Sequence, residues 1–167
     1  MFDTEGGPPR RVRDLFPPEC WTDYEEWVMQ EARAIAQRRL EAKDVMDSPG
    51  ATRGYFRARL MGLDHEVFGC LFLDNRHRVL AFEVLFHGTI DGCAVHPRVV
   101  AKRALLLNAA AVIAVHNHPS GIPEPSAADV AITRRLGEAL ALMDVRLLDH
   151  FVVGGAEIVS LAERGLI

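Results

Sequence analysis

The sequence predicts an α/β domain in which a mixed sheet packs against helices. Strand-like apolar runs alternate with amphipathic stretches, and the predicted order of elements is α, α, β, β, α, β, α, β, β. Hydrophobic residues occupy 49% of the 167 positions, which is enough to bury a core. The nine Pro and 13 Gly are spread between these runs, so the composition is not that of a disordered or repetitive chain.

The N-terminal part of the chain is predicted to lie outside the main domain. Residues 1 to about 20 are rich in Gly, Pro and Arg and show no period, which indicates a tail. Thr22 to Glu25 has the form of a capping box, and a helical pattern continues from there to about Ala42. We therefore divide the chain into an N-terminal tail and helix, residues 1–44, and a main domain, residues 45–167.

The main domain is predicted to open with a helix and a hairpin. Ser48 is expected to be the N-cap of a helix with Pro49 at its first position, and Gly62 is expected to stop it. Two strand-like runs follow, at 66–73 and 79–86. The short polar turn between them predicts that they pair as an antiparallel hairpin.

The second half of the domain alternates helices and strands. An amphipathic helix is expected from Pro97 to about Asn108, before a strand at 111–115 that is apolar on both faces, as buried central strands are. A polar loop follows at 116–125. The remaining predicted elements are a helix at 126–143, a strand at 145–153, a Gly-Gly turn and a short strand around Ile158.

Composition excludes several classes of protein. Cys20, Cys70 and Cys93 are an odd number without CxxC spacing, which argues against a disulfide framework and a cysteine zinc site. The N-terminus lacks the apolar core of a signal peptide. The longest apolar run, 109–115, is far too short to cross a bilayer. We therefore expect a cytoplasmic protein with no membrane partner.

The charge balance argues against strong non-specific DNA binding. The formal net charge is −4 and the sequence pI is about 6.0, whereas such binding depends on neutralising phosphates with Lys and Arg. A weakly supported DNA association would have to use the few basic residues that cluster along the chain, which are Arg10, Arg11, Arg53, Arg57 and Arg59. The alternative interpretation of these arginines is a solvated surface.

The loop after the predicted central strand holds a candidate metal site. His116 and His118 lie where that strand ends, and Asp129 lies in the first turn of the next predicted helix. Two imidazoles and a carboxylate form a three-ligand zinc set that leaves a fourth position for a water molecule, whose pKa the ion lowers. Two simpler interpretations stay open: Ser126 and Asp129 can cap the helix, and paired histidines occur by chance.

These residues resemble a known family. HNHPSG at 116–121, with Ser126 and Asp129 in an H-x-H-x(10)-D spacing, is similar to the JAB/MPN+ (JAMM) metalloprotease superfamily and, within it, to the RadC-like proteins. The resemblance extends over about residues 45–167 and includes LFHGTI at 85–90, VHPR at 95–98 and LLDHFVVG at 147–154. It implies a three-layer α/β/α fold related to cytidine deaminases, zinc on His116, His118 and Asp129, and a Ser126 that helps to hold the reacting oxyanion.

An active member of this family also needs an upstream glutamate as general base. Glu83 lies inside the otherwise apolar run AFEVLF, where an unpaired buried carboxylate would be costly, so it is expected to have a partner or a task. Its match to the family's strand glutamate makes Glu83 the predicted base. The alternative is an edge-strand residue that points to water.

Three functions compete at this point. The first is a zinc-dependent peptidase or isopeptidase that acts on a protein or peptide substrate, with Glu83 and Ser126 as catalytic residues. The second is a non-catalytic module that binds a protein or a DNA-associated complex. The third, a zinc-dependent nuclease or base deaminase, is disfavoured because the H-x-E and P-C-x-x-C signatures of the deaminases are missing.

Overall fold

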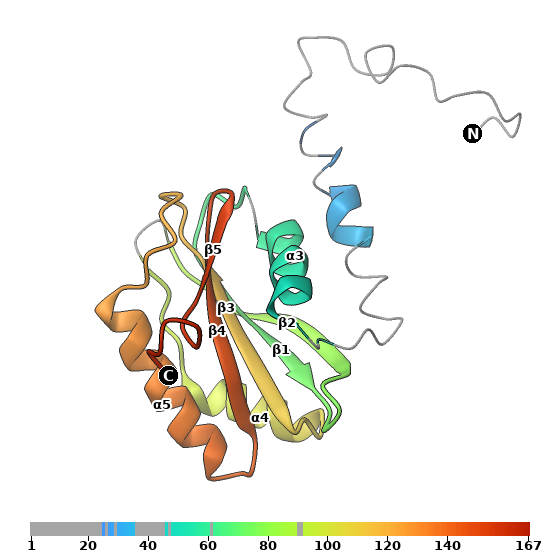
Figure 1. Cartoon of the computed structure of the whole chain (residues 1–167), viewed down its shortest axis with the longest axis vertical. Coiled ribbons are helices and arrows are strands. Elements are labelled where there is room, and N and C mark those ends of the chain that lie inside the picture. The colour runs from blue at the N-terminus through green and yellow to red at the C-terminus, as the bar shows by residue number, and fades with distance from the viewer. Residues whose placement is uncertain are drawn as a thin grey trace, which may run out of the picture.

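A five-stranded mixed sheet forms the centre of the domain in the computed structural model (Figure 1). The structure describes residues 25, 27–28, 30–35, 46, 48–60, 62–89 and 92–167. The strand order is β2-β1-β3-β4-β5; β3 and β4 are parallel and the other neighbours are antiparallel. The strands are β1 (Val67–Leu73), β2 (Val79–His87), β3 (Ala111–Asn117), β4 (Arg146–Gly154) and β5 (Glu157–Ser160).

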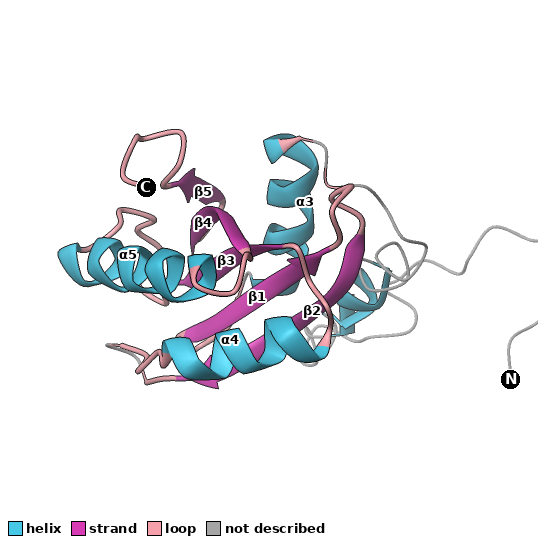
Figure 2. Ribbon diagram, turned by 90° about the horizontal axis from the view of Figure 1, so that it is seen from below, coloured by secondary structure: helices cyan, strands magenta, loops and turns pink. Residues whose placement is uncertain are grey.

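Helices cover both faces of this sheet, which gives three layers (Figure 2). Helix α3 (Pro49–Leu60) packs on one face, where Tyr55 and Phe56 join a core cluster with one side of the strands. Helices α4 (Pro97–Leu106) and α5 (Ala127–Ala141) pack on the other face. The predicted α/β class and its three-layer arrangement are therefore confirmed.

Strand alternation explains why the central strands are mostly apolar. In β1, Leu71 and Leu73 belong to the cluster under α3, whereas Phe68, Cys70 and Phe72 belong to the cluster under α4 and α5. Every residue of β1 and of β3 is buried. Because successive side chains point to opposite faces, a strand that is covered on both sides is apolar at most positions, and His116 and Asn117 at the end of β3 are the buried polar exceptions.

The predicted elements of the main domain are confirmed, with small shifts at their ends. Strand β1 begins at Val67, so Glu66 precedes it, and β3 continues two residues further than predicted, through His116 and Asn117. Of the first predicted helix, residues 25, 27–28 and 30–35 are helical. The predicted tail, Thr22 of the capping box and Ala42 lie outside the described residues. Within the described part of the chain, no helix combines the length and apolarity needed to span a bilayer.

The parallel pair β3 and β4 fixes the position of the polar loop. Both strands run toward the same edge of the sheet, and the ladder between them continues past β3, where the backbone N–H of His118 donates to the carbonyl oxygen of Val153 at 2.8 Å. The chain then returns to the sheet through α5, whose first turn carries Asp129. The carboxyl edge of parallel strands is a common place for binding sites, because loops and helix N-termini meet there.

Candidate metal centre

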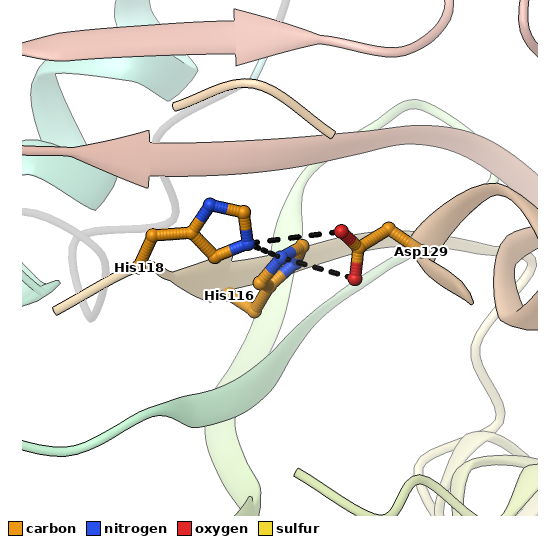
Figure 3. Close-up of side chains that lie close together, drawn as sticks. All are labelled: His116, His118 and Asp129. Atoms are coloured by element: carbon orange, nitrogen blue, oxygen red, sulfur yellow. Dashed lines mark hydrogen bonds and ion pairs between the residues drawn. The ribbon is translucent and has the colours of Figure 1, made fainter. Parts of the chain in front are cut away.

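Three predicted ligands meet at the carboxyl end of β3. His116 is the penultimate residue of that strand, His118 follows it, and Asp129 projects from the first turn of α5. Their ligand atoms all lie within 4.8 Å of one another. Figure 3 shows both imidazole rings turned toward the carboxylate of Asp129. The chain therefore brings together a possible metal-binding triad from residues up to 13 positions apart in the sequence.

The spacing of the ligand atoms fits a small tetrahedral ion. The distance between the Nε2 atoms of His116 and His118 is 2.9 Å. Asp129 Oδ1 lies 3.3 Å from His116 Nε2, and Asp129 Oδ2 lies 3.7 Å from His118 Nε2. Bonds of about 2.0–2.1 Å to a tetrahedral zinc ion place its ligand atoms roughly 3.3 Å apart. Two imidazole nitrogens and a carboxylate oxygen are also the donor types that zinc accepts.

Asp129 serves the helix and the triad at the same time. Its Oδ2 accepts hydrogen bonds from the backbone N–H of Ser126 at 2.7 Å and from the Ser126 hydroxyl at 2.6 Å. The Ser126 oxygen in turn accepts from the backbone N–H of Asp129 at 3.1 Å, which completes a capping box. The capping interpretation is thus confirmed, and it does not compete with the ligand interpretation, because Oδ1 still faces His116.

The electrostatics of the triad favour a charged carboxylate. Burial acts to raise the pKa of Asp129, but hydrogen bonds with His116, His118 and Ser126 outweigh it and hold this pKa well below its usual range. The hydrogen bond with Asp129 raises the pKa of His118. Burial and the neighbouring His116 lower the pKa of His150, which lies behind the triad.

A cleft of about 540 Å³ opens beside the triad. Its wall includes His118, Ser126 and Asp129, together with Glu66, which precedes β1. The other residues that line the cleft are apolar or small, except for Arg135, and include Phe68, Cys93, Val95 and Ile132. The carboxylates of Glu66 and Asp129 therefore both belong to the lining of this cleft.

The β1–β3 ladder explains why Glu66 reaches this cleft. Phe68 pairs with His116 in antiparallel register, and continuing this register places Glu66 opposite His118. Residues that are directly opposite in a ladder project from the same face. The negative charge of Glu66 is also one cause of the raised pKa of His118.

Asn117 holds the segment that carries Glu66. Its side-chain Oδ1 accepts from the backbone N–H of Val67 at 2.8 Å, and its Nδ2 donates to the carbonyl oxygen of His65 at 2.9 Å. The amide side chain thus extends the ladder past the last backbone pair and bonds on both sides of Glu66. Asn117 itself is 3% exposed, so these bonds are shielded from water.

Glu83, the predicted general base, lies elsewhere. It is opposite Cys70, which pairs with Ala114, and is therefore further from the end of β3 than the Phe68–His116 pair. Both carboxylate oxygens accept hydrogen bonds from Arg103 on α4, each at 2.5 Å. Glu83 is not among the residues that line the cleft. The cost of a carboxylate in an apolar strand is thus offset by a partner, as the sequence analysis expected, but the strand pattern did not identify that partner as Arg103.

Two residues were missed or left without a role by the sequence analysis. The sequence did contain a signal for Glu66. It directly precedes β1, and β1 pairs antiparallel with β3, so the start of β1 lies beside the end of β3, where the paired histidines are. His150 is fully buried, and its Nε2 lies 2.8 Å from Nδ1 of His116. No local pattern signals this second contact, because the two residues are on different strands of a parallel pair.

Comparison with known proteins identifies the family. Residues 46–166 match the family of RadC-like JAB domains. The chain is 61% identical over 138 residues to a "UPF0758 protein" of Azotobacter vinelandii, an alignment that covers 83% of this chain and 62% of the relative. It is 64% identical over 128 residues to one of Nitrosococcus oceani, covering 77% of this chain and 57% of the relative.

A third relative, the "UPF0758 protein" of Stutzerimonas stutzeri, is 60% identical over 138 residues, which are 83% of this chain and 62% of that protein. The chain thus spans about three fifths of the length of the curated relatives that it matches. The residues that match the family, 46–166, include the triad, the residues that line the cleft and all five strands. The chain belongs to the RadC-like JAB domain family.

Proposed function

We propose that this chain is a zinc-dependent hydrolase that cleaves amide bonds in protein or peptide substrates. The observation that carries the proposal is the convergence of His116, His118 and Asp129 beside a cleft that His118, Asp129 and Glu66 line. A structural metal site needs no cleft, whereas a hydrolytic one needs ligands, a proton acceptor and room for a substrate in one place. The net charge of −4 is poorly suited to a polyanionic substrate and favours a peptide.

The three ligands have defined tasks in this proposal. His116 and His118 would bind the ion through Nε2, and Asp129 through Oδ1, the oxygen that Ser126 leaves free. When bound, the ion supplies Lewis acidity and acidifies a water molecule. The four hydrogen-bonding atoms of the capping box keep the Asp129 carboxylate in place before the ion arrives, so little ordering is needed on binding.

Glu66 takes the proton-transfer role that the sequence assigned to Glu83. Its carboxylate accepts a proton from the attacking water and returns it to the leaving amine. Its place opposite His118 and its share in the raised pKa of His118 support this assignment. The two bonds from Asn117 restrain the backbone on either side of Glu66, which limits the positions available to its side chain.

Ser126 acts first through Asp129. Its hydroxyl proton is directed to Asp129 Oδ2, so the residue orients a metal ligand. The contact with a reacting oxyanion that the family resemblance implies would require this proton to turn toward the cleft, which Ser126 lines. That contact stays a prediction.

Metal analysis tests the first part of the proposal. We expect about one zinc per chain after dialysis, and loss of the metal in His118→Ala and Asp129→Ala proteins that keep their far-ultraviolet circular dichroism. A Cys70→Ser, Cys93→Ser protein should keep its zinc. Full zinc occupancy in the His118→Ala protein would reject the site.

A matched pair of variants tests the assignment of the base. Glu66→Gln and Glu83→Gln change the same atoms, one inside the cleft and one at the sheet–α4 interface. An untargeted cleavage profile of a peptide library should show products with the wild-type and Glu83→Gln proteins. Glu66→Gln should reduce the rate by a factor of about 10² to 10⁴ at equal zinc content. The opposite ranking would return the role to Glu83.

The same assay separates the competing functions. Products from peptides but not from DNA support the hydrolase. Cleavage of DNA would overturn the substrate class, and a zinc-loaded protein that cleaves neither would favour a non-catalytic binding module.

A further inference from the structure

A continuous chain of buried hydrogen bonds leads from helix α5 to the metal triad. It begins at Thr133, whose Oγ1 lies 2.5 Å from the carbonyl oxygen of Asp129 and 2.6 Å from Nδ1 of His150. It continues from Nε2 of His150 to Nδ1 of His116 at 2.8 Å. Thr133 and His150 have no exposed surface and His116 is 1% exposed, so water cannot substitute for any of these bonds.

The chemistry of the groups fixes which atom donates and which accepts in each of these hydrogen bonds. A backbone carbonyl only accepts, so the hydroxyl proton of Thr133 points to Asp129 O, as Ser and Thr side chains in helices often bond to the carbonyl four residues back. Thr133 Oγ1 must then accept from His150, which places the proton of His150 on Nδ1. Its Nε2 is left as an acceptor and takes the proton of His116 Nδ1.

The neutral form of His150 follows from its surroundings. Within the described part of the chain, its ring nitrogens bond only to Thr133 and His116, and neither is an anion. A charged imidazole at this position would be buried with no anion in contact with the ring, which costs several kcal/mol. A neutral ring with a single N–H satisfies both of its contacts.

We propose that Thr133 and His150 are positioning residues that hold His116 in its Nδ1–H tautomer, with the lone pair of Nε2 directed at the metal position. The inference rests on the proposed metal function of the triad. Hydrogen bonds behind a metal-binding histidine select its tautomer and ring orientation, and their loss typically reduces metal affinity by about 10–100-fold. Here the selection begins at a helix hydroxyl, two side chains away from the ligand.

The order of donors and acceptors in these hydrogen bonds predicts the effect of removing the Thr133 hydroxyl. Thr133→Val keeps the shape of the side chain but leaves Nδ1–H of His150 without an acceptor. His150 then gains by moving its proton to Nε2, from which it donates to His116 Nδ1. His116 is forced into the Nε2–H form, whose proton occupies the lone pair that a metal needs. Thr133→Ser keeps the hydroxyl and therefore the order of donors and acceptors.

Nitrogen-15 NMR of metal-free protein tests the tautomers without any metal or activity. In wild-type protein labelled at histidine and held at alkaline pH, we expect both His116 and His150 as Nδ1–H tautomers, assigned with His116→Ala and His150→Gln samples. An Nε2–H form of His116 in the wild-type protein would overturn the proposed relay, meaning the hydrogen bonds from Thr133 through His150 that select the tautomer of His116, whatever the metal content. Because this spectrum needs no Thr133 variant, a variant that does not fold leaves the inference testable.

Metal competition against a chromogenic chelator provides the second readout. We expect zinc affinity to fall about 10–100-fold in Thr133→Val and to stay within about threefold of wild type in Thr133→Ser. Thr52→Val is the matched control, because Thr52 is a buried helix residue whose hydroxyl also donates to the carbonyl four residues back, at 3.2 Å from Ser48 O. It lies in α3, which packs on the opposite face of the sheet from α5. The Thr52→Val protein should lose stability without losing zinc affinity.

The outcomes are distinguishable from those of the proposed function. If wild-type protein binds no zinc, the function fails, and the tautomer spectrum alone decides the relay. If wild-type protein binds zinc and Thr133→Val binds it equally well with unchanged tautomers, the relay is rejected and the metal site stands. Visible spectra of cobalt-substituted protein should show an altered ligand field in Thr133→Val and an unaltered one in Thr133→Ser and Thr52→Val.

Discussion

Glu83 on β2 and Arg103 on α4 form a bidentate ion pair that joins the sheet to the helix layer. Nε and Nη2 of Arg103 donate to Oε2 and Oε1 of Glu83, each at 2.5 Å. Planar guanidinium and carboxylate groups match in this geometry, which also fixes the orientation of both side chains. The pair gives a polar residue in an apolar strand a structural task.

Loss of this pair should affect stability and not metal binding. Glu83→Gln removes the charge and one acceptor oxygen, and because the pair is partly exposed we expect the melting temperature to fall by about 4 °C at most. Zinc content should equal that of wild type. Arg103→Gln should give the same shift, and the double variant should show less than the sum of the two. A loss of zinc in Glu83→Gln would contradict the geometry.

Asp129→Asn separates the cap from the ligand. The amide keeps an acceptor for the helix N-terminus, so in the presence of a chelator the free energy of unfolding should change by about 1 kcal/mol or less. With zinc present, the variant should lose most of the stabilisation that the ion provides to wild type. The measurement is thermal unfolding of both proteins with zinc and with chelator.

Ser126→Ala is the comparison variant for that experiment, because it weakens the cap and leaves all three ligand side chains present. It removes the hydroxyl of the capping box and should cost about 0.5–2 kcal/mol with chelator, whereas with zinc it should keep most of the stabilisation that the ion provides, because the Asp129 carboxylate remains. Shifts of Asp129→Asn that are equal with zinc and with chelator would show that Asp129 acts only as a cap.

Asn117→Ala should loosen the start of β1. It removes two buried hydrogen bonds and leaves the backbone N–H of Val67 without its partner, at a cost of about 1–3 kcal/mol. Hydrogen exchange should accelerate at the Val67 amide more than at Cys70, in the middle of the strand. Asn75→Ala, in the exposed hairpin turn, is the control and should change neither stability nor exchange. Equal acceleration along all of β1 would indicate global destabilisation instead.

Cys93 reports on the charge of Glu66. Burial and the nearby charge of Glu66 raise the pKa of the Cys93 thiol, so at neutral pH less of it is thiolate than in an ordinary cysteine. Alkylation of Cys93 in a Cys20→Ser protein should therefore be slow near neutral pH and accelerate as the pH rises. Glu66→Gln removes one cause of the shift and should increase the rate several-fold at neutral pH.

Cys70 provides the internal reference for the alkylation experiment. It is fully buried, and burial raises the pKa of its thiol strongly. It should react only when the protein unfolds. An unchanged Cys93 rate in Glu66→Gln would contradict the placement of Glu66 beside the cleft.

The order of the elements and the members of the candidate metal-binding triad could be predicted from the sequence. Periodicity and capping residues gave the order of helices and strands, because burial of one face or two is recorded locally in the pattern of apolar positions. The candidate triad is also local: His116 and His118 lie at the end of one strand, and Asp129 lies in the first turn of the next helix. These three residues lie within 13 positions of one another, and the short loop between the strand and the helix keeps them close together in space.

Strand pairing in the folded protein sets which glutamate lines the cleft beside the triad. The alternation of apolar and polar residues indicates the face of the sheet to which a side chain points. It does not indicate which residues lie opposite it on the neighbouring strands. That pairing depends on the register between strands that are distant in sequence, which brings Glu66 level with His118 and leaves Glu83 beside Arg103. Asn117 bonds to residues about 50 positions away, and His150 reaches His116 from a strand 34 positions later. Such contacts exist only after the sheet has formed, because they are set by strand pairing and helix packing and not by the neighbouring residues of the chain.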